Sequence, residues 1–126
     1  MAVNTTAFLE ALTGRVNKIL PCYYEEATGK EGFPYAVIGG VKLTDLAEGD
    51  LALFYIDLWG DEKEPETAVR LEELCDRLRR ELTGEVLALP GVFASHIGFE
   101  SQNPMYEDEF DIAHRRLSLS ARIFYN

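Results

Sequence analysis

The stretch LALFYIDLW, residues 51–59, alternates between two sets of side chains and predicts the central strand of a sheet. The first set is wholly apolar and consists of Ala52, Phe54, Ile56 and Leu58. The second set mixes apolar, aromatic and acidic groups and consists of Leu51, Leu53, Tyr55, Asp57 and Trp59. Because both faces carry apolar groups, we expect an interior strand, or a strand whose outer face meets a partner.

Other strands are predicted on both sides of this stretch. In the C-terminal segment, Arg115–Asn126, one face is apolar and carries Leu117, Leu119, Ala121, Ile123 and Tyr125. The opposite face is polar and carries Arg116, Ser118, Ser120 and Arg122. Shorter strands are expected at Cys22–Glu26, Phe33–Ile38 and Val92–Glu100. We expect Gly39-Gly40 to end or bulge the second of these, with Val41–Leu43 continuing it, and residues 101–114 to form a long loop.

Two amphipathic helices are predicted. In Thr5–Leu20 the apolar side chains recur at steps of three and four, and Pro21 ends the pattern. The second helix runs from Pro65 to about Leu82, and Gly84 follows it as a terminating residue. Its apolar stripe consists of Ala68, Leu71, Leu74, Cys75, Leu78 and Leu82. Cys75 is therefore interpreted as a packed small hydrophobic residue rather than a reactive thiol.

The order of these elements predicts one α+β domain spanning residues 1–126. Strands grouped in pairs favour a two-layer sandwich: a mainly antiparallel sheet of four to five strands with both helices on one face. The second helix joins the strand from Leu51 to the strand from Val92, which allows one right-handed crossover.

Composition excludes several classes of protein. Twenty-two Asp and Glu against 12 Lys and Arg give a net charge of −10, which disfavours specific binding to nucleic acid. The two cysteines, Cys22 and Cys75, are too few for a disulfide scaffold. The chain shows neither a signal-peptide pattern nor an apolar run long enough to span a bilayer, so we expect a soluble protein that stays in the cytoplasm.

The search for catalytic and metal-binding patterns predicts no enzyme, cofactor or metal. Ser95 and His96 are neighbours on one predicted strand, so their side chains point to opposite faces and cannot pair. The acidic run 107–111 lacks the glycine and the distal glutamate of a calcium loop and is interpreted as a solvated loop tip. Asp57, Asp61 and Glu62 form a weak carboxylate group near a strand end. The basic clusters Arg77–Arg80 and His114–Arg116 lie beside acids and are interpreted as salt-bridging surface or subunit contacts.

Several landmarks occur together in a characteristic order. They are an N-terminal amphipathic helix, the strand FPYAV (33–37), the segment YIDLWG (55–60), the charged leucine helix 66–82 and the final strand RLSLSARIFYN (116–126). In this order and spacing the chain resembles the tail terminator, or tail completion, proteins of long-tailed bacteriophages and prophages. The resemblance covers nearly the whole chain.

The resemblance implies a virion protein that assembles into a hexameric ring, although the chain can remain a monomer in solution before it assembles. Such a ring caps the tail tube, stops its polymerisation and supports head–tail joining, so the implied partners are a tail tube protein and a head-closure protein. Assembly would take place in the cytoplasm of the bacterial host. The loops around Gly29–Gly32, Asp61–Glu64 and Gln102–Glu109 are expected to reach neighbouring subunits or the tube. The candidate interface residues are Tyr55, Asp57, Trp59, Asp61, Glu62, Met105, Tyr106, Arg115 and Arg116.

A hexamer would carry a formal charge of roughly −60, and acids lining its bore would let DNA pass without binding. Two other classes of function remain open. One is a small dimeric ligand-binding or regulatory α+β domain. The other is a hydrolase that uses Asp57 or His96.

Overall fold

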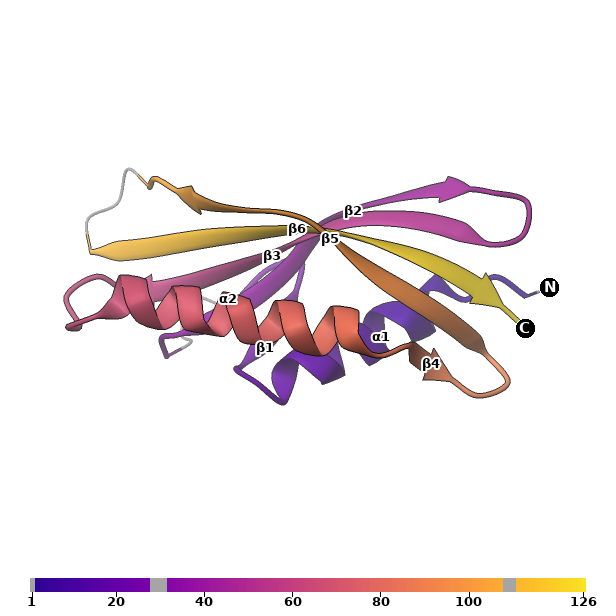
Figure 1. Cartoon of the computed structure of the whole chain (residues 1–126), viewed down its shortest axis with the longest axis horizontal. Helices are drawn as coiled ribbons and strands as arrows, with labels where there is room; N and C mark the ends of the chain where they lie inside the picture. Colours follow the sequence, from indigo (N-terminus) through magenta and orange to yellow (C-terminus); the bar gives the residue numbers. More distant parts are fainter. Residues whose placement is uncertain (1, 28–31, 108–110) are drawn as a thin grey trace.

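A six-stranded sheet and two helices make up the computed structural model, which describes residues 2–27, 32–107 and 111–126. The elements are α1 (Thr5–Asn17), β1 (Cys22–Tyr24), β2 (Tyr35–Asp45), β3 (Asp50–Asp61), α2 (Thr67–Gly84), β4 (Leu87–Leu89), β5 (Phe93–Met105) and β6 (Ile112–Tyr125). The strand order is β1-β2-β3-β6-β5-β4 (Figure 1). β1 and β2 pair in parallel, and the other neighbouring strands pair antiparallel.

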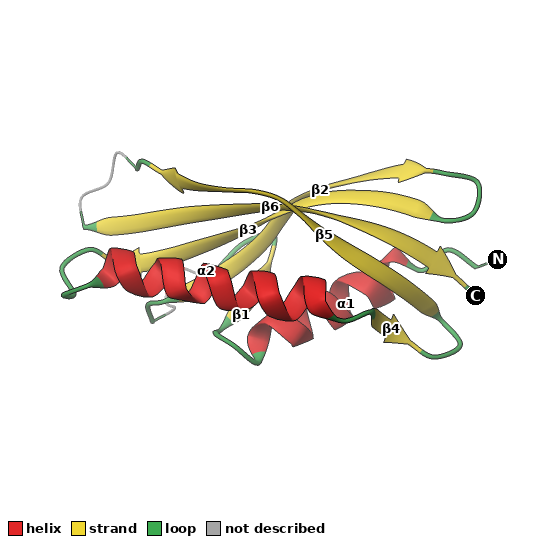
Figure 2. Ribbon diagram, viewed as in Figure 1, coloured by secondary structure: helices red, strands yellow, loops and turns green. Residues whose placement is uncertain are grey.

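Both helices pack against the same face of the sheet (Figure 2). The core lies between the two layers, and its helical contribution is Phe8, Leu12, Val16, Leu71, Cys75, Leu78 and Leu82. We call the opposite surface the helix-free face. The ladder registers place on it Tyr35, Val37, Lys42, Leu53, Tyr55, Asp57, Trp59, His96, Asn103, Met105, His114, Arg116, Ser118, Ser120 and Arg122.

The central position of β3 confirms the two-sided pattern of its sequence. Its inward residues Ala52, Phe54, Ile56 and Leu58 are at most 2% exposed. On the other side Tyr55 remains 38% exposed. The general α+β class is therefore confirmed, with an interior strand whose second face stays open to a partner.

The predicted number of four to five strands is wrong, because the sheet has six. The missed strand is β4, which forms a tight hairpin with β5 across Pro90-Gly91. Three residues are too few to display an alternating pattern, so sequence periodicity could not reveal β4. The sheet is also mixed, since the β1–β2 pair is parallel.

The long loop predicted for residues 101–114 is also wrong. β5 continues to Met105 and β6 already begins at Ile112. The register shifts between Phe99 and Ser101, where the extra residue Glu100 inverts the alternation and hides the continuing strand. Gln102–Met105 is therefore strand rather than loop. Residues 108–110 of the acidic run and 29–31 of the predicted Gly29–Gly32 loop lie outside the described residues.

α1 is shorter than predicted, whereas α2 keeps its predicted length but lies two residues further along the chain and includes Gly84. α1 ends at Asn17, whose side-chain Oδ1 accepts a hydrogen bond from the Cys22 amide at 3.0 Å. α2 begins at Thr67 rather than Pro65, because the backbone of Glu66 is left-handed (φ 62°). The Thr67 hydroxyl donates to the carbonyl oxygens of Asp61 and Glu64 and so closes the β3–α2 connection.

Candidate functional site

Four of the nine predicted interface residues, Tyr55, Asp57, Trp59 and Arg116, form a cluster on the helix-free face, where Met105 also lies. Tyr55, Asp57 and Trp59 are alternate residues of β3, so their side chains leave the sheet on the same side. Asp57 lies opposite Arg116 in the β3–β6 ladder, and Trp59 lies opposite His114. The central strand pair therefore displays one polar and aromatic cluster away from the helices.

A two-armed ion pair forms the centre of this cluster. Arg116 Nε donates to Asp57 Oδ1 at 2.8 Å, and a terminal guanidinium nitrogen donates to Oδ2 at 3.2 Å. The Arg116 guanidinium carbon also lies 4.2 Å from the centre of the Tyr55 ring. Burial raises the pKa of the Asp57 carboxyl, but contacts with His114 and Arg116 outweigh burial and leave that pKa lowered. The hydrogen bond to Asp57 raises the pKa of Arg116 in turn.

His114 is the most enclosed member of the cluster, with only 3% of its surface exposed. Its Nδ1 lies 2.6 Å from Glu107 Oε1, which connects the hairpin tip to β6. Its Nε2 lies 2.9 Å from Asp57 Oδ1, although the geometry of this contact falls outside that of a hydrogen bond. From the sequence, His114 was interpreted only as part of a basic cluster and Glu107 as part of an acidic loop tip. Extending the alternation of residues 116–122 back by one step would have placed His114 beside Arg116.

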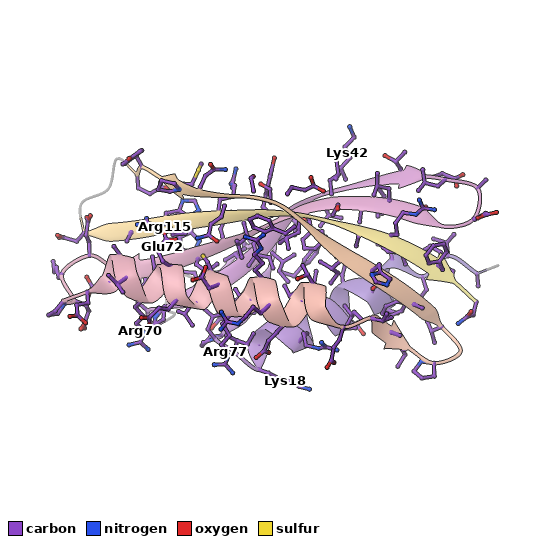
Figure 3. The ribbon with its side chains drawn as sticks, in the orientation of Figure 1. Lys18, Lys42, Arg70, Glu72, Arg77 and Arg115 are labelled. Atoms are coloured by element: carbon purple, nitrogen blue, oxygen red, sulfur yellow. The ribbon has the colours of Figure 1, made fainter. Side chains whose placement is uncertain are left out.

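Arg115 lies on the opposite side of the sheet from Arg116. Its Nε donates to Glu72 Oε1 of α2 at 2.5 Å, and Gln102 Nε2 donates to the other carboxylate oxygen of Glu72. Figure 3 shows Glu72 and Arg115 together between α2 and the sheet. Arg115 therefore fixes α2 to the sheet in this structure and does not share a surface with the Asp57–Arg116 pair.

A groove of about 540 Å³ occupies the end of the molecule between α2 and the β5–β6 hairpin. It is lined by four predicted interface residues, Glu62, Met105, Tyr106 and Arg115. Tyr106 is 93% exposed. Asp61, the remaining predicted residue, instead accepts a hydrogen bond from the Lys63 amide and shapes the turn beside the groove.

Acidic residues gather at the end of the molecule that holds this groove. By sequence, Asp61, Glu62, Glu64 and Glu66 against Lys63 give −3 for residues 61–66, and Glu107 and Asp111 add two acids from the facing hairpin. The two segments are joined where Lys63 pairs with Asp111 at 3.4 Å. The helix-free face carries charges of both signs, since it combines Asp57 with Lys42, Arg116 and Arg122. Beside the groove, by contrast, the described acids outnumber the bases.

The nucleophilic side chains considered in the sequence, Ser95, Cys22 and Cys75, are all buried. Ser95 is buried and donates to the Leu87 carbonyl at 2.7 Å, whereas His96 is exposed on the other face, as the alternation predicted. Cys75 is fully buried, which confirms its predicted packing role, and burial raises the pKa of Cys22 and of Cys75 to about 12. Within residues 2–27, 32–107 and 111–126, no group of three or more His, Cys, Asp or Glu side chains is arranged to hold a metal. None of the described helices combines the length and apolarity needed to cross a membrane.

Comparison with known proteins identifies a shared fold. No protein-family model matches the chain, and no curated protein matches it by sequence. Among solved structures, the chain is similar to a chain of the structure described as "Virion of native gene transfer agent (GTA) particle". The TM-score is 0.67 at 19% sequence identity, and the match covers 94% of this chain and 98% of that chain. Subunits from the two sources therefore have the same fold along nearly their whole lengths.

Proposed function

We propose that the chain is a structural protein of a phage-like virion, and specifically a tail terminator. Copies of it form a hexameric ring that caps the tail tube, stops tube growth and offers a surface for head–tail joining. The observation that carries the proposal is the fold shared end to end with a chain of a gene transfer agent virion. Because both chains are covered almost completely, the likeness concerns the whole subunit rather than a common substructure.

The surfaces of the chain support a role in assembly. The helix-free face leaves Leu53, Tyr55 and Phe124 about two-fifths exposed on neighbouring strands. Exposed apolar groups beside ordered ion pairs are typical of surfaces that become buried in a complex. In this proposal the chain catalyses no reaction and takes no cofactor. It assembles in the cytoplasm of a bacterial host with tail tube and head-closure proteins, and it stays in the virion tail.

The direct test is reconstitution with the tail tube protein encoded in the same genome. With the chain present, electron microscopy should show tubes of restricted length, each ending in a sixfold ring. Without it, the tubes should be longer and lack the ring. Tubes that grow unchanged and uncapped in the presence of the folded chain would exclude the terminator function. Genes for tube, tape-measure and head-closure proteins beside this gene would support it independently.

The groove at the end of the molecule favours a second candidate, a small dimeric ligand-binding domain. Its volume of about 540 Å³ suits a small molecule, and Tyr106, His114 and Arg115 offer it aromatic and polar contacts. Light scattering together with native mass spectrometry separates the two candidates. A stable dimer that retains a small molecule would favour the ligand-binding domain over the ring protein.

A further inference from the structure

Each long strand near the margin of the sheet has a partly uncovered edge. β1 covers β2 only at Ala36–Ile38, and β4 covers β5 only at Phe93–Ser95. Within the described part of the chain, no strand pairs with the outer edge of β2 at residues 40–45 or of β5 at residues 96–105. Figure 2 shows β2 and β5 running well past their short neighbours. An uncovered strand edge is a template for pairing with another chain.

Backbone groups on both edges point outward in a matching pattern. The Ala36 amide donates to Pro21 and the Ile38 carbonyl accepts from Glu25, so even-numbered residues of β2 face outward before its bulge. The register shift between Gly39 and Lys42 then turns Leu43 and Asp45 outward. On β5, the Val92 carbonyl accepts a hydrogen bond from the Asn126 amide, so before the bulge at Glu100 even-numbered residues face β6 and odd-numbered ones turn outward. Ile97 and Phe99 therefore offer N–H and C=O groups to a neighbour.

The side chains beside these edges are complementary when the edges run antiparallel. With Leu43 opposite Phe99, two apolar side chains share the helix side of the sheet, since their ladder partners Ala52 and Leu119 are buried there. The same register brings Lys42 opposite Glu100.

These two charges lie on the same side of the sheet. Lys42 projects from the helix-free face (Figure 3), and Glu100 Oε1 accepts a hydrogen bond from Ser120 on that face at 2.8 Å. Among the described residues Lys42 forms no ion pair, so its charge is free to meet a partner's carboxylate.

We propose that residues 43–45 of one copy pair antiparallel with residues 97–99 of a second copy, with Lys42 of the first against Glu100 of the second. The inference rests on the proposed ring and names its subunit contact. The two edges belong to opposite margins of the sheet, so the contact is heterologous and every copy keeps an edge for the next one. A heterologous contact closes a ring when its rotation divides a full turn, whereas a two-fold dimer would pair one edge with itself.

Features on these edges restrict indiscriminate pairing. Both contain a bulge, and Pro104 stands at an outward position of β5 where its missing N–H is not needed within the sheet. Only a short run on each strand can therefore pair. Because the contact pairs only three residues of each strand, it should be weak. Copies of the chain would therefore associate when a template or a high concentration brings them together.

Charge reversal tests the contact. Lys42→Glu and Glu100→Lys should each lower the association constant roughly tenfold, because each reversal sets like charges opposite each other. The double variant K42E/E100K should return to within about threefold of the natural chain. Glu73→Lys, an exposed change on α2, is the matched control and should leave association unchanged. Sedimentation measures the constants, and thermal melts check folding. Folded single variants that associate normally, or a double variant without recovery, would overturn the proposal.

Cysteine cross-linking gives a second readout. The natural thiols are buried with pKa values of about 12, so at neutral pH a short bis-maleimide should react only with introduced cysteines. In concentrated protein, tagged Lys42→Cys should link to untagged Glu100→Cys. A link between two Glu100→Cys chains would indicate a two-fold dimer, and that result or no link at all would overturn the proposal. Sixfold rings seen without a link between Lys42→Cys and Glu100→Cys would refute the proposed contact but not the proposed ring. That link without capped tubes would refute the terminator function alone.

Discussion

Trp59 and His114 lie face to face across the β3–β6 ladder, with ring centroids 3.8 Å apart and ring planes inclined by 19°. The indole covers one side of the imidazole, whose edges reach Asp57 and Glu107. One stack therefore joins the central strand, the last strand and the hairpin tip. Because Trp59, His114 and Asp57 lie on the helix-free face, they order the surface that we propose for assembly.

Removing the imidazole should destabilise the folded chain. His114→Ala deletes the stack and leaves the carboxylates of Asp57 and Glu107 facing each other, so the free energy of unfolding should fall by about 1–3 kcal/mol. Urea denaturation followed by tryptophan fluorescence measures the change, since Trp59 is the only tryptophan. His96→Ala is the control, because His96 is exposed and should change stability by less than about 0.5 kcal/mol. Equal effects of the two variants would contradict the structural role of the stack.

Asp57 should make stability depend on pH in the acid range. Its pKa is lowered in the folded chain from an ordinary value of 3.8, so the unfolded chain binds the proton more tightly. The stabilising contribution is therefore complete above the unfolded pKa and is lost as pH falls through the folded pKa. At neutral pH, Asp57→Asn should cost about 1–3 kcal/mol, since Arg116 loses its charged partner.

Denaturation series at stepped pH values test this linkage. The natural chain should lose stability more steeply below about pH 4 than the Asp57→Asn variant. Asp111→Asn is a control in an exposed ion pair, where solvent screens the interaction. Parallel curves for the natural and Asp57→Asn chains would show that Asp57 has the same pKa in both states.

Glu72 should stabilise the packing of α2 against the sheet. Glu72→Ala removes the acceptor of both Arg115 and Gln102, and we expect a loss of about 1–2 kcal/mol because the pair is only partly shielded from water. Hydrogen exchange should quicken in the N-terminal half of α2. Glu73→Ala, next to it but exposed, should leave both stability and exchange nearly unchanged. A similar loss from both variants would point to helix propensity rather than to this contact.

The strands with an unbroken alternation were the predictable part of the fold. The sequence of β3 identified its buried face residue by residue, and the run from Arg116 to Tyr125 did the same for β6. Prediction failed where one extra residue inverts the pattern: Glu100 hid the second half of β5. In β2 the Gly39-Gly40 pair correctly indicated the bulge. Gly40 adopts φ +63° beside the Tyr55 ring, a backbone conformation that glycine adopts more readily than other residues.

Only part of the candidate site could be derived in the same way. Alternation in β3 was enough to group Tyr55, Asp57 and Trp59 on one face. The partner strand was not knowable, because register between strands distant in sequence depends on three-dimensional packing. Arg115 and Arg116 were grouped as neighbours in sequence, although consecutive residues of a strand point to opposite faces. The groove residues meet only because the β5–β6 hairpin folds back beside α2.

Two glycines should respond in opposite directions to the same substitution. A Cβ on Gly49 would lie 2.0 Å from the Ile123 carbonyl oxygen, and this backbone atom cannot move without separating β3 from β6. Gly49→Ala should therefore lower the free energy of unfolding by more than about 2 kcal/mol. A Cβ on Gly14, inside α1, would have no atom within 4 Å. Gly14→Ala should raise stability by roughly 0.5–1 kcal/mol through helix propensity. Thermal and urea unfolding of both variants provide the comparison, and a Gly49→Ala chain as stable as the natural one would show that the β2–β3 turn does not pack this closely against β6.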